Sequence, residues 1–219
     1  MIATMGKILS RYGTVFLDGL KGTLWISAVA IVFGTILGVA VAITKMSKHR
    51  LTRMIASVYI EILRGTPLLL QLYFFWLGLP TLFPKISDMS CVLIAMVINT
   101  SAYIAECIRA GIQAVDSGQR EAAMSLGMTE RNIMFRVIFP QAIKNILPAL
   151  GNEFIVMIKE SSLASVFFIG ELMTSFKVVQ SNMFLAIEPL TIVGLIYLVV
   201  TVILTQCLKL FERRLKAND

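Results

Sequence analysis

The sequence predicts an all-α integral membrane protein in which one domain, residues 1–219, contains five membrane-spanning helices. Hydrophobic residues occupy 57% of the 219 positions, charged residues occupy 15%, and the mean hydropathy is +0.82. A soluble domain carries about 25% charged residues and less apolar content. Because one span takes about 20 apolar residues, the chain has room for five or six helices joined by short loops.

The distribution of basic residues selects five spans over six. The formal net charge is +7, and the lysines and arginines cluster in residues 45–53, 116–144 and 209–219. Cytoplasmic loops of membrane proteins are rich in Lys and Arg, so this pattern indicates topology rather than nucleic-acid binding. Five spans place all three clusters in the cytoplasm, with the N-terminus outside and the C-terminus inside. A sixth span at residues 163–179 would place the last cluster outside, so we expect that short segment to be re-entrant or interfacial.

The first predicted span follows a short, mildly amphipathic lead-in at residues 1–20. The span covers residues 23–43, and within it Gly34 and Gly38 lie four positions apart. Small residues at this spacing let a second helix approach closely. We therefore expect this face of the first span to pack against another helix.

The second predicted span, residues 55–79, contains a break. Pro67 lacks a backbone N–H donor and disfavours helical geometry at Thr66, so the span should kink or stop there. The polar residues 159–162 should end the fourth apolar segment in the same abrupt way. The third, fourth and last apolar segments are residues 91–114, 147–158 and 189–208.

A hydrophilic segment, residues 117–140, separates the third and fourth spans and must therefore lie in water. We expect it to begin with a short helix capped by Ser117, with Glu121 near the positive end of the helix dipole. Ala122 and Ala123 add helix propensity without bulk, which would let another protein approach closely. Composition alone is explained equally well by a solvated hairpin that has no partner.

The second half of this segment has its own start and stop signals. Gly127 suits the left-handed position that ends a helix. Thr129 is a suitable first residue for a second helix, which we expect to end near Pro140. The segment is thus predicted to form a helical hairpin.

The hairpin also contains a recognisable signature. Glu121-Ala122-Ala123, followed by Gly127 and then by Val137-Ile138-Phe139-Pro140, resembles the EAA signature of binding-protein-dependent ABC importer permeases. At Val137 and Phe139 the family usually has Ile and Leu, so the apolar character is kept. Other stretches resemble the polar amino acid subfamily of these permeases: Arg64–Leu72, Thr100–Glu106, Gly111–Ala114, Gly151–Glu153 and Lys159–Leu163.

The resemblance implies the five-helix fold of type I ABC importer permeases and ATP-driven uptake of polar amino acids, basic ones included. Glu121, Ala122, Ala123 and Gly127 would belong to a coupling helix that docks on a cytoplasmic ATPase dimer. That ATPase would bind ATP and Mg²⁺, and this chain would hold no cofactor. The other implied partners are an external solute-binding protein and a second permease subunit, in a homodimer or a heterodimer. The expected location is the bacterial plasma (inner) membrane.

One ionisable residue inside the fourth apolar segment is a candidate substrate ligand. An ionisable group at the centre of a bilayer costs about 2.5–3.5 kcal/mol on insertion scales, so it requires a reason. Glu153 could bind the α-amino group or a cationic side chain of a substrate, and the adjacent Asn152 is a further candidate ligand. A hydrogen bond between helices, or a neutral carboxyl group, explains its presence equally well.

Four polar residues in the other spans complete the candidate substrate site. Asn99 and Thr100 lie near the middle of the third span, where they could hydrogen-bond to a bound amino acid or could link two helices. Thr66 and Gln71 lie at the break in the second span. Broken helices in transporters expose backbone groups to a central cavity, which makes these two residues further, weaker candidates.

Two acid–base pairs inside the spans are predicted to be structural. Glu61 with Arg64, and Glu106 with Arg109, are spaced i, i+3, which places both members on one face of a helix. We expect each pair to neutralise itself. Neither pair is therefore assigned to the substrate site.

Two alternatives to an ABC permease remain open. The sequence contains no Walker A loop and no HExxH motif, so the energy source must be another chain or an ion gradient. A self-contained ion-coupled transporter or channel would need an internal repeat, rings of pore-lining charge or coupling-ion ligands, and no convincing set is present. A membrane scaffold without transport activity would tolerate substitution of Glu121 and Gly127.

Overall fold

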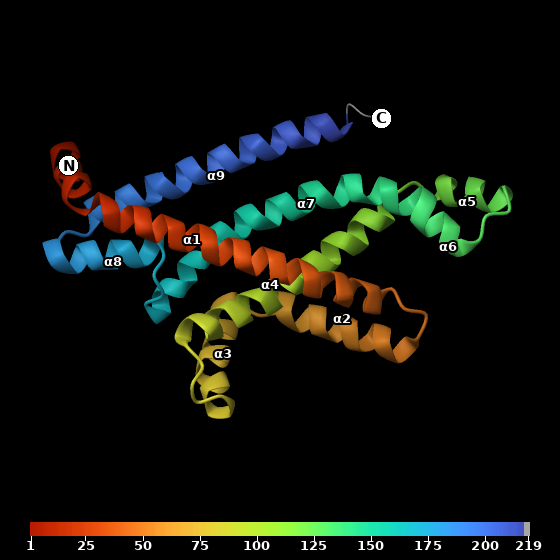
Figure 1. Cartoon of the computed structure of the whole chain (residues 1–219), viewed down its shortest axis with the longest axis horizontal. Helices are drawn as coiled ribbons and strands as arrows, with labels where there is room; N and C mark the ends of the chain where they lie inside the picture. The colour runs from red at the N-terminus through yellow and green to blue at the C-terminus, as the bar shows by residue number, and fades with distance from the viewer. Residues whose placement is uncertain (217–219) are drawn as a thin grey trace.

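The computed structural model describes residues 1–216, and within that range every regular element is a helix (Figure 1). The elements are α1 (Ile2–Lys45), α2 (Arg50–Gly65), α3 (Leu68–Leu82), α4 (Asp88–Gln113), α5 (Ser117–Ser125), α6 (Glu130–Ile133), the π-helical turn η1 (Met134–Ile138), α7 (Phe139–Glu160), the 3-10 helix η2 (Ser161–Phe167), α8 (Leu172–Met183) and α9 (Ile187–Lys216).

The lengths of the apolar helices agree with the five predicted spans. α1, α4, α9 and the continuous helical run Glu130–Phe167 are each long and apolar enough to cross a membrane. α2 and α3 meet the same criterion together, as a pair bent by 106°. α8 has 12 residues and is therefore only about 18 Å long, too short for a hydrocarbon core of about 30 Å. The segment 163–179 accordingly does not form a sixth span.

The lead-in at residues 1–20 is part of α1 rather than a separate element. Its only interruption is Tyr12, whose backbone angles (φ −119°, ψ 15°) are not helical, and the chain changes direction there. Figure 1 shows this first part of α1 beside α8 and the start of α9. Ile8 and Phe16 pack there with Leu172 and Val179 in one apolar cluster, which explains why the lead-in is helical.

The centre of the fold is the packing of α1 against α4. A Cβ atom added to Gly34 would lie 2.8 Å from Thr100 Cγ2, and one added to Gly38 would lie 2.8 Å from Ile104 Cγ2. These distances are shorter than ordinary van der Waals contact, so both positions require glycine at the present helix separation. The predicted small-residue face is therefore confirmed, and its partner is α4.

The predicted break in the second span is also confirmed. Thr66 (φ −120°, ψ 146°) and Pro67 (φ −61°, ψ 136°) both have extended backbone angles, and α3 leaves in a new direction. The predicted end of the fourth segment is less abrupt than expected, because α7 ends at Glu160 but the helical run continues as the 3-10 helix η2 to Phe167.

Two details of the hydrophilic segment differ from the prediction. The N-cap of α5 is Asp116 rather than Ser117, since Asp116 Oδ1 accepts a 2.7 Å hydrogen bond from the N–H of Gly118. The first turn of α5 consequently has no acidic residue, and Glu121 lies too far along the helix to stabilise its positive end.

The second helix does not end near Pro140. α6, η1 and α7 form one uninterrupted helical run, and Pro140 lies in the first turn of α7. The π-helical turn directly before Pro140 explains this difference. A π turn shifts the hydrogen-bonding register by one residue, so the helix can pass a residue that has no N–H donor.

Candidate functional site

A cavity of about 180 Å³ lies between α4 and α7. Its lining combines polar side chains from both helices with two apolar ones: Asn99, Thr100, Tyr103, Glu153, Val156, Met157 and Glu160. The structure therefore brings together three of the residues predicted to bind substrate, namely Asn99, Thr100 and Glu153. Asn152 lies beside Glu153 in the sequence but is exposed and does not line the cavity.

Several polar groups in this cavity have unused hydrogen-bonding capacity. Thr100 is 2% exposed, and its Oγ1 is buried without a hydrogen-bond partner. Among residues 1–216, no side chain donates a hydrogen bond to Glu153 or Glu160 or forms an ion pair with either. A buried polar group without a partner costs free energy, so the buried Thr100 Oγ1 favours a ligand that satisfies it.

Thr66 and Gln71 do not line this cavity, because they stabilise the break between α2 and α3. Gln71 Nε2 donates to the carbonyl oxygen of Leu63 (2.8 Å) and to Thr66 Oγ1 (2.9 Å). Gln71 Oε1 accepts a 2.9 Å hydrogen bond from Asn99 Nδ2. Gln71 is 6% exposed, and this network ties the free end of α2 to α3 and α4. Asn99 therefore belongs to both the network and the cavity wall.

Glu160 and Tyr103 line the cavity but were not among the predicted site residues. Glu153, Val156, Met157 and Glu160 are spaced i, i+3, i+4 and i+7, which places them on one face of α7. This spacing was visible in the sequence and could have identified Glu160. In the sequence it stood out only as one of the polar residues 159–162 that end the fourth apolar segment.

A cluster of charged residues lies near the cavity. Glu106 on α4 accepts hydrogen bonds from Lys45 Nζ (3.1 Å) and from the guanidinium group of Arg109, and Arg64 NH1 lies 4.0 Å from its Oε1. The predicted Glu106–Arg109 pair is thus confirmed. The predicted Glu61–Arg64 pair is wrong, because Arg64 points toward Glu106 and its guanidinium carbon lies 5.4 Å from the ring centre of Tyr103.

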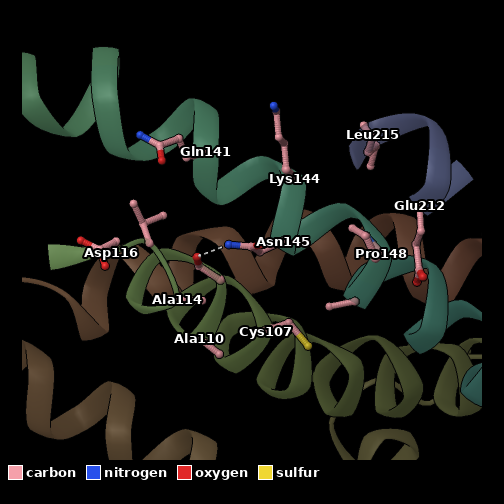
Figure 2. Close-up of a pocket in the computed structure, with 13 residues that line it drawn as sticks. Cys107, Ala110, Ala114, Asp116, Gln141, Lys144, Asn145, Pro148, Glu212 and Leu215 are labelled. Atoms are coloured by element: carbon pink, nitrogen blue, oxygen red, sulfur yellow. Dashed lines mark hydrogen bonds between the residues drawn. The ribbon is translucent and has the colours of Figure 1, made fainter. Parts of the chain in front are cut away.

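A larger, partly open cavity of about 780 Å³ is lined by α4, α7 and the C-terminal part of α9 (Figure 2). Its polar lining includes Asp116, Gln141, Asn145 and Glu212, and Asn145 Nδ2 donates to the backbone oxygen of Gly111 at 3.4 Å. None of the residues predicted to bind substrate lines it. It lies beside the start of α5, at the hairpin end of the molecule.

The hairpin of α5 and α6 has its own small apolar core. Ala123 is 5% exposed and packs against Ile133 and Ile138, whereas Glu121 and Ala122 are exposed. Of the four predicted coupling residues, Ala123 therefore fixes the helix in place, and Glu121 and Ala122 face outward.

The end of α5 is equally well defined. Gly127 has a φ of +74°, its N–H bonds the carbonyl of Met124, and the N–H of Met128 bonds the carbonyl of Ala123. These are the two hydrogen bonds of a Schellman motif, so the predicted left-handed conformation of Gly127 at the end of the helix is confirmed. An ion pair between Arg120 and Glu130 closes the hairpin.

The outer surface of the hairpin includes exposed apolar side chains. Leu126 is 82% exposed and Met124 is 46% exposed, in a segment that is otherwise hydrophilic. Exposed apolar residues beside a rigid polar surface are typical of protein–protein contact sites.

Five apolar spans, a small polar cavity between α4 and α7 and a hairpin protruding at one end are the features of a membrane permease. The family model of the binding-protein-dependent transport system inner membrane component matches residues 30–217. The chain belongs to this family, and its fold is the core of type I ABC importer permeases. It is accordingly a multi-pass membrane protein and a permease subunit rather than a catalytic enzyme.

Individual relatives agree with this assignment. The chain is 42% identical over 204 residues to the arginine transport system permease protein ArtQ of Bacillus subtilis, covering 93% of each chain. It is 48% identical to a solved amino acid ABC transporter with histidines, with a TM-score of 0.92 and coverage of 94% of this chain and 96% of the other. A methionine ABC transporter, MetNI, in an inward-facing conformation shares the fold at 16% identity, with a TM-score of 0.79 and coverage of 94% and 98%.

Proposed function

We propose that this chain is the permease subunit of an ATP-driven importer of polar amino acids, basic ones included. The observation that supports this most directly is the self-packed α5–α6 hairpin, which presents Glu121, Ala122 and Leu126 to the solvent. A rigid element of this kind can transmit the movement of a soluble ATPase to the spans. The names of the relatives, which refer to arginine transport and to an amino acid transporter with histidines, support the substrate class.

The orientation follows from the positions of the basic clusters. The loop between α1 and α2, the α5–α6 hairpin and the C-terminal part of α9 all lie toward one end of the molecule, and the N-terminus lies at the other (Figure 1). Positively charged loops face the cytoplasm, so the hairpin end is the cytoplasmic end and the N-terminus is outside. The hairpin is then on the side where ATP and Mg²⁺ are available to the partner ATPase, and the chain needs no cofactor of its own.

The size of the cavity supports a second permease subunit. Pockets that bind small molecules usually measure about 300–1,000 Å³. The cavity between α4 and α7 measures only about 180 Å³, so this chain supplies one wall of a larger site. A homodimer or a heterodimer would complete it, with an ATPase dimer on the cytoplasmic side and a solute-binding protein on the outer side.

The test is ATPase activity of the complex purified through this subunit and reconstituted in liposomes with its binding protein. We expect stimulation by a small set of polar amino acids. Gly127→Val places a β-branched residue at φ +74° and should abolish uptake while the protein stays in the membrane. Glu121→Lys should do the same by reversing the charge of the docking surface. Uptake that continues without ATP but stops when the ion gradient collapses would replace this proposal with an ion-coupled transporter.

A further inference from the structure

The lead-in at the start of α1 is an amphipathic helix. Met5, Ile8, Leu9 and Tyr12 are spaced i, i+3, i+4 and i+7, so one face of the lead-in is apolar. Ile8 is 0% exposed and packs in the apolar cluster that includes residues of α8 and α9. The chain changes direction at Tyr12, so the lead-in does not continue the line of the first span. A helix of this kind lies in the plane of the membrane surface, with its apolar face toward the acyl chains.

The other face of the lead-in has two basic residues that no acidic side chain neutralises. Lys7 and Arg11 are one helical turn apart and exposed, and among residues 1–216 neither forms an ion pair. Asp18, further along α1, is paired with Lys21 at 3.0 Å, and Glu188, in the first turn of α9, forms no ion pair. The orientation proposed above puts Lys7 and Arg11 on the outer side, where the positive-inside rule does not account for them.

An apolar groove of about 310 Å³ lies beside the lead-in. Its wall is formed by Met5 and Leu9 of the lead-in, by Leu20 further along α1 and by part of α9 between Ile192 and Val200, and every residue that lines it is apolar. Leu9 is 46% exposed and Val199 is 55% exposed, so the groove opens on the outer surface of the molecule. The α9 part of the wall is about 12 Å long, close to the depth of about 15 Å that the hydrocarbon of one leaflet occupies.

We infer that the lead-in and this groove bind an anionic phospholipid, with an acyl chain along α9 and the phosphate headgroup at Lys7 and Arg11. A phospholipid has its charge at the membrane surface and its chains beneath, and the basic face and the apolar groove follow the same order. Both basic side chains are long enough to reach a headgroup beside the helix. Each basic residue near the surface should favour an anionic lipid by about fivefold. The inference goes beyond the proposed function, because it concerns the lipid around the spans and not the transported solute.

The experiment measures how phospholipids brominated on their acyl chains quench a single tryptophan in the permease–ATPase complex reconstituted in bilayers. Trp25 and Trp76 are replaced by phenylalanine, and Leu198→Trp supplies the reporter, three residues from the groove residue Leu195 and therefore adjacent to it on the helix surface. The bilayers mix phosphatidylcholine with phosphatidylglycerol of the same chains, and either lipid is brominated in turn. We expect phosphatidylglycerol to bind beside the reporter more tightly than phosphatidylcholine by about fivefold or more.

The variant that tests the headgroup contacts is Lys7→Gln combined with Arg11→Gln. In this variant the affinities of the two lipids should come to within about twofold of each other. Quenching by brominated phosphatidylcholine should stay unchanged, which would show that the groove is still formed. The matched control is Lys48→Gln combined with Arg50→Gln, which removes the same charge from exposed residues at the other end of the spans. It should leave the preference for phosphatidylglycerol at the reporter unchanged.

Three results would overturn the inference. Equal quenching by both lipids before any basic residue is changed would show that the groove contacts only bulk lipid. No quenching by either lipid would show that another protein surface, such as the second permease subunit, covers the groove. A preference that persists without Lys7 and Arg11 would show that these residues do not bind the headgroup.

Discussion

Replacing Gly34 by alanine tests whether the close packing of α1 on α4 supports the cavity. The new Cβ would lie 2.8 Å from Cγ2 and 2.9 Å from Cβ of Thr100, so the two helices must separate by about 0.5–1 Å to restore ordinary contact. Overpacking of this kind costs about 1–3 kcal/mol. Alanine is better than glycine inside a helix by about 0.5–1 kcal/mol, which leaves a net loss of about 1 kcal/mol in the middle of the range.

The assay is thermal unfolding of the purified permease in detergent, followed by tryptophan fluorescence. For a chain of this length a loss of about 1 kcal/mol lowers Tm by about 2–4 °C, and Gly34→Ala should lower it by this amount. Because Thr100 lines the cavity, stimulation of the ATPase by substrate should fall as well.

Gly194→Ala is the control for this prediction. Gly194 lies inside α9, and a Cβ atom added there would meet nothing within 4 Å. This variant should gain about 0.5–1 kcal/mol from helix propensity and keep its substrate response. Equal Tm values for the two variants would refute the claim that the α1–α4 distance is fixed by glycine.

Two further substitutions test the ion pairs. Glu106→Gln removes the negative charge between Lys45 and Arg109, and these three side chains are only 20–30% exposed, so we expect a loss of about 2 kcal/mol and a Tm several degrees lower. An unchanged Tm would mean that the cluster is neutralised in another way. Arg120→Ala breaks a pair whose side chains are 49% and 62% exposed, so stability should change by less than about 1 kcal/mol, measured in the same assay. A larger loss would show that the Arg120–Glu130 pair holds the hairpin together.

The features predicted correctly from the sequence are those that depend on local properties of the chain. The spans follow from hydropathy and length, and the break at Pro67 follows from the missing N–H donor. Gly127 follows from the left-handed conformation that few other residues adopt. The partner of Arg64 was wrong because Glu61, three residues away, competes with Glu106 on another helix, and sequence spacing contains no information about that helix.

The cap of α5 was missed for a different reason. Asp116 and Ser117 are adjacent and are both good N-cap residues, so propensity could not distinguish them. The hydrogen bond from the N–H of Gly118 to Asp116 Oδ1 shows that Asp116 is the N-cap. A shift of one residue in the cap moves Glu121 out of the first turn, which leaves its carboxylate exposed on the surface proposed to contact the ATPase.

The continuity of the helix through Pro140 links the two candidate sites. A helix ending at Pro140 would have left a flexible joint between the hairpin and the fourth span, and movement of the hairpin could then be absorbed there. The observed helical run instead extends from Glu130 in the hairpin to Glu153 and Glu160 in the cavity wall. Because a helix resists compression and bending, a displacement of the hairpin must move the two carboxylates as well, except for what the π turn Met134–Ile138 and the helix at Pro148 can absorb. In the proposed importer, the binding of substrate and the movement of the ATPase are therefore coupled through a single helix of this subunit.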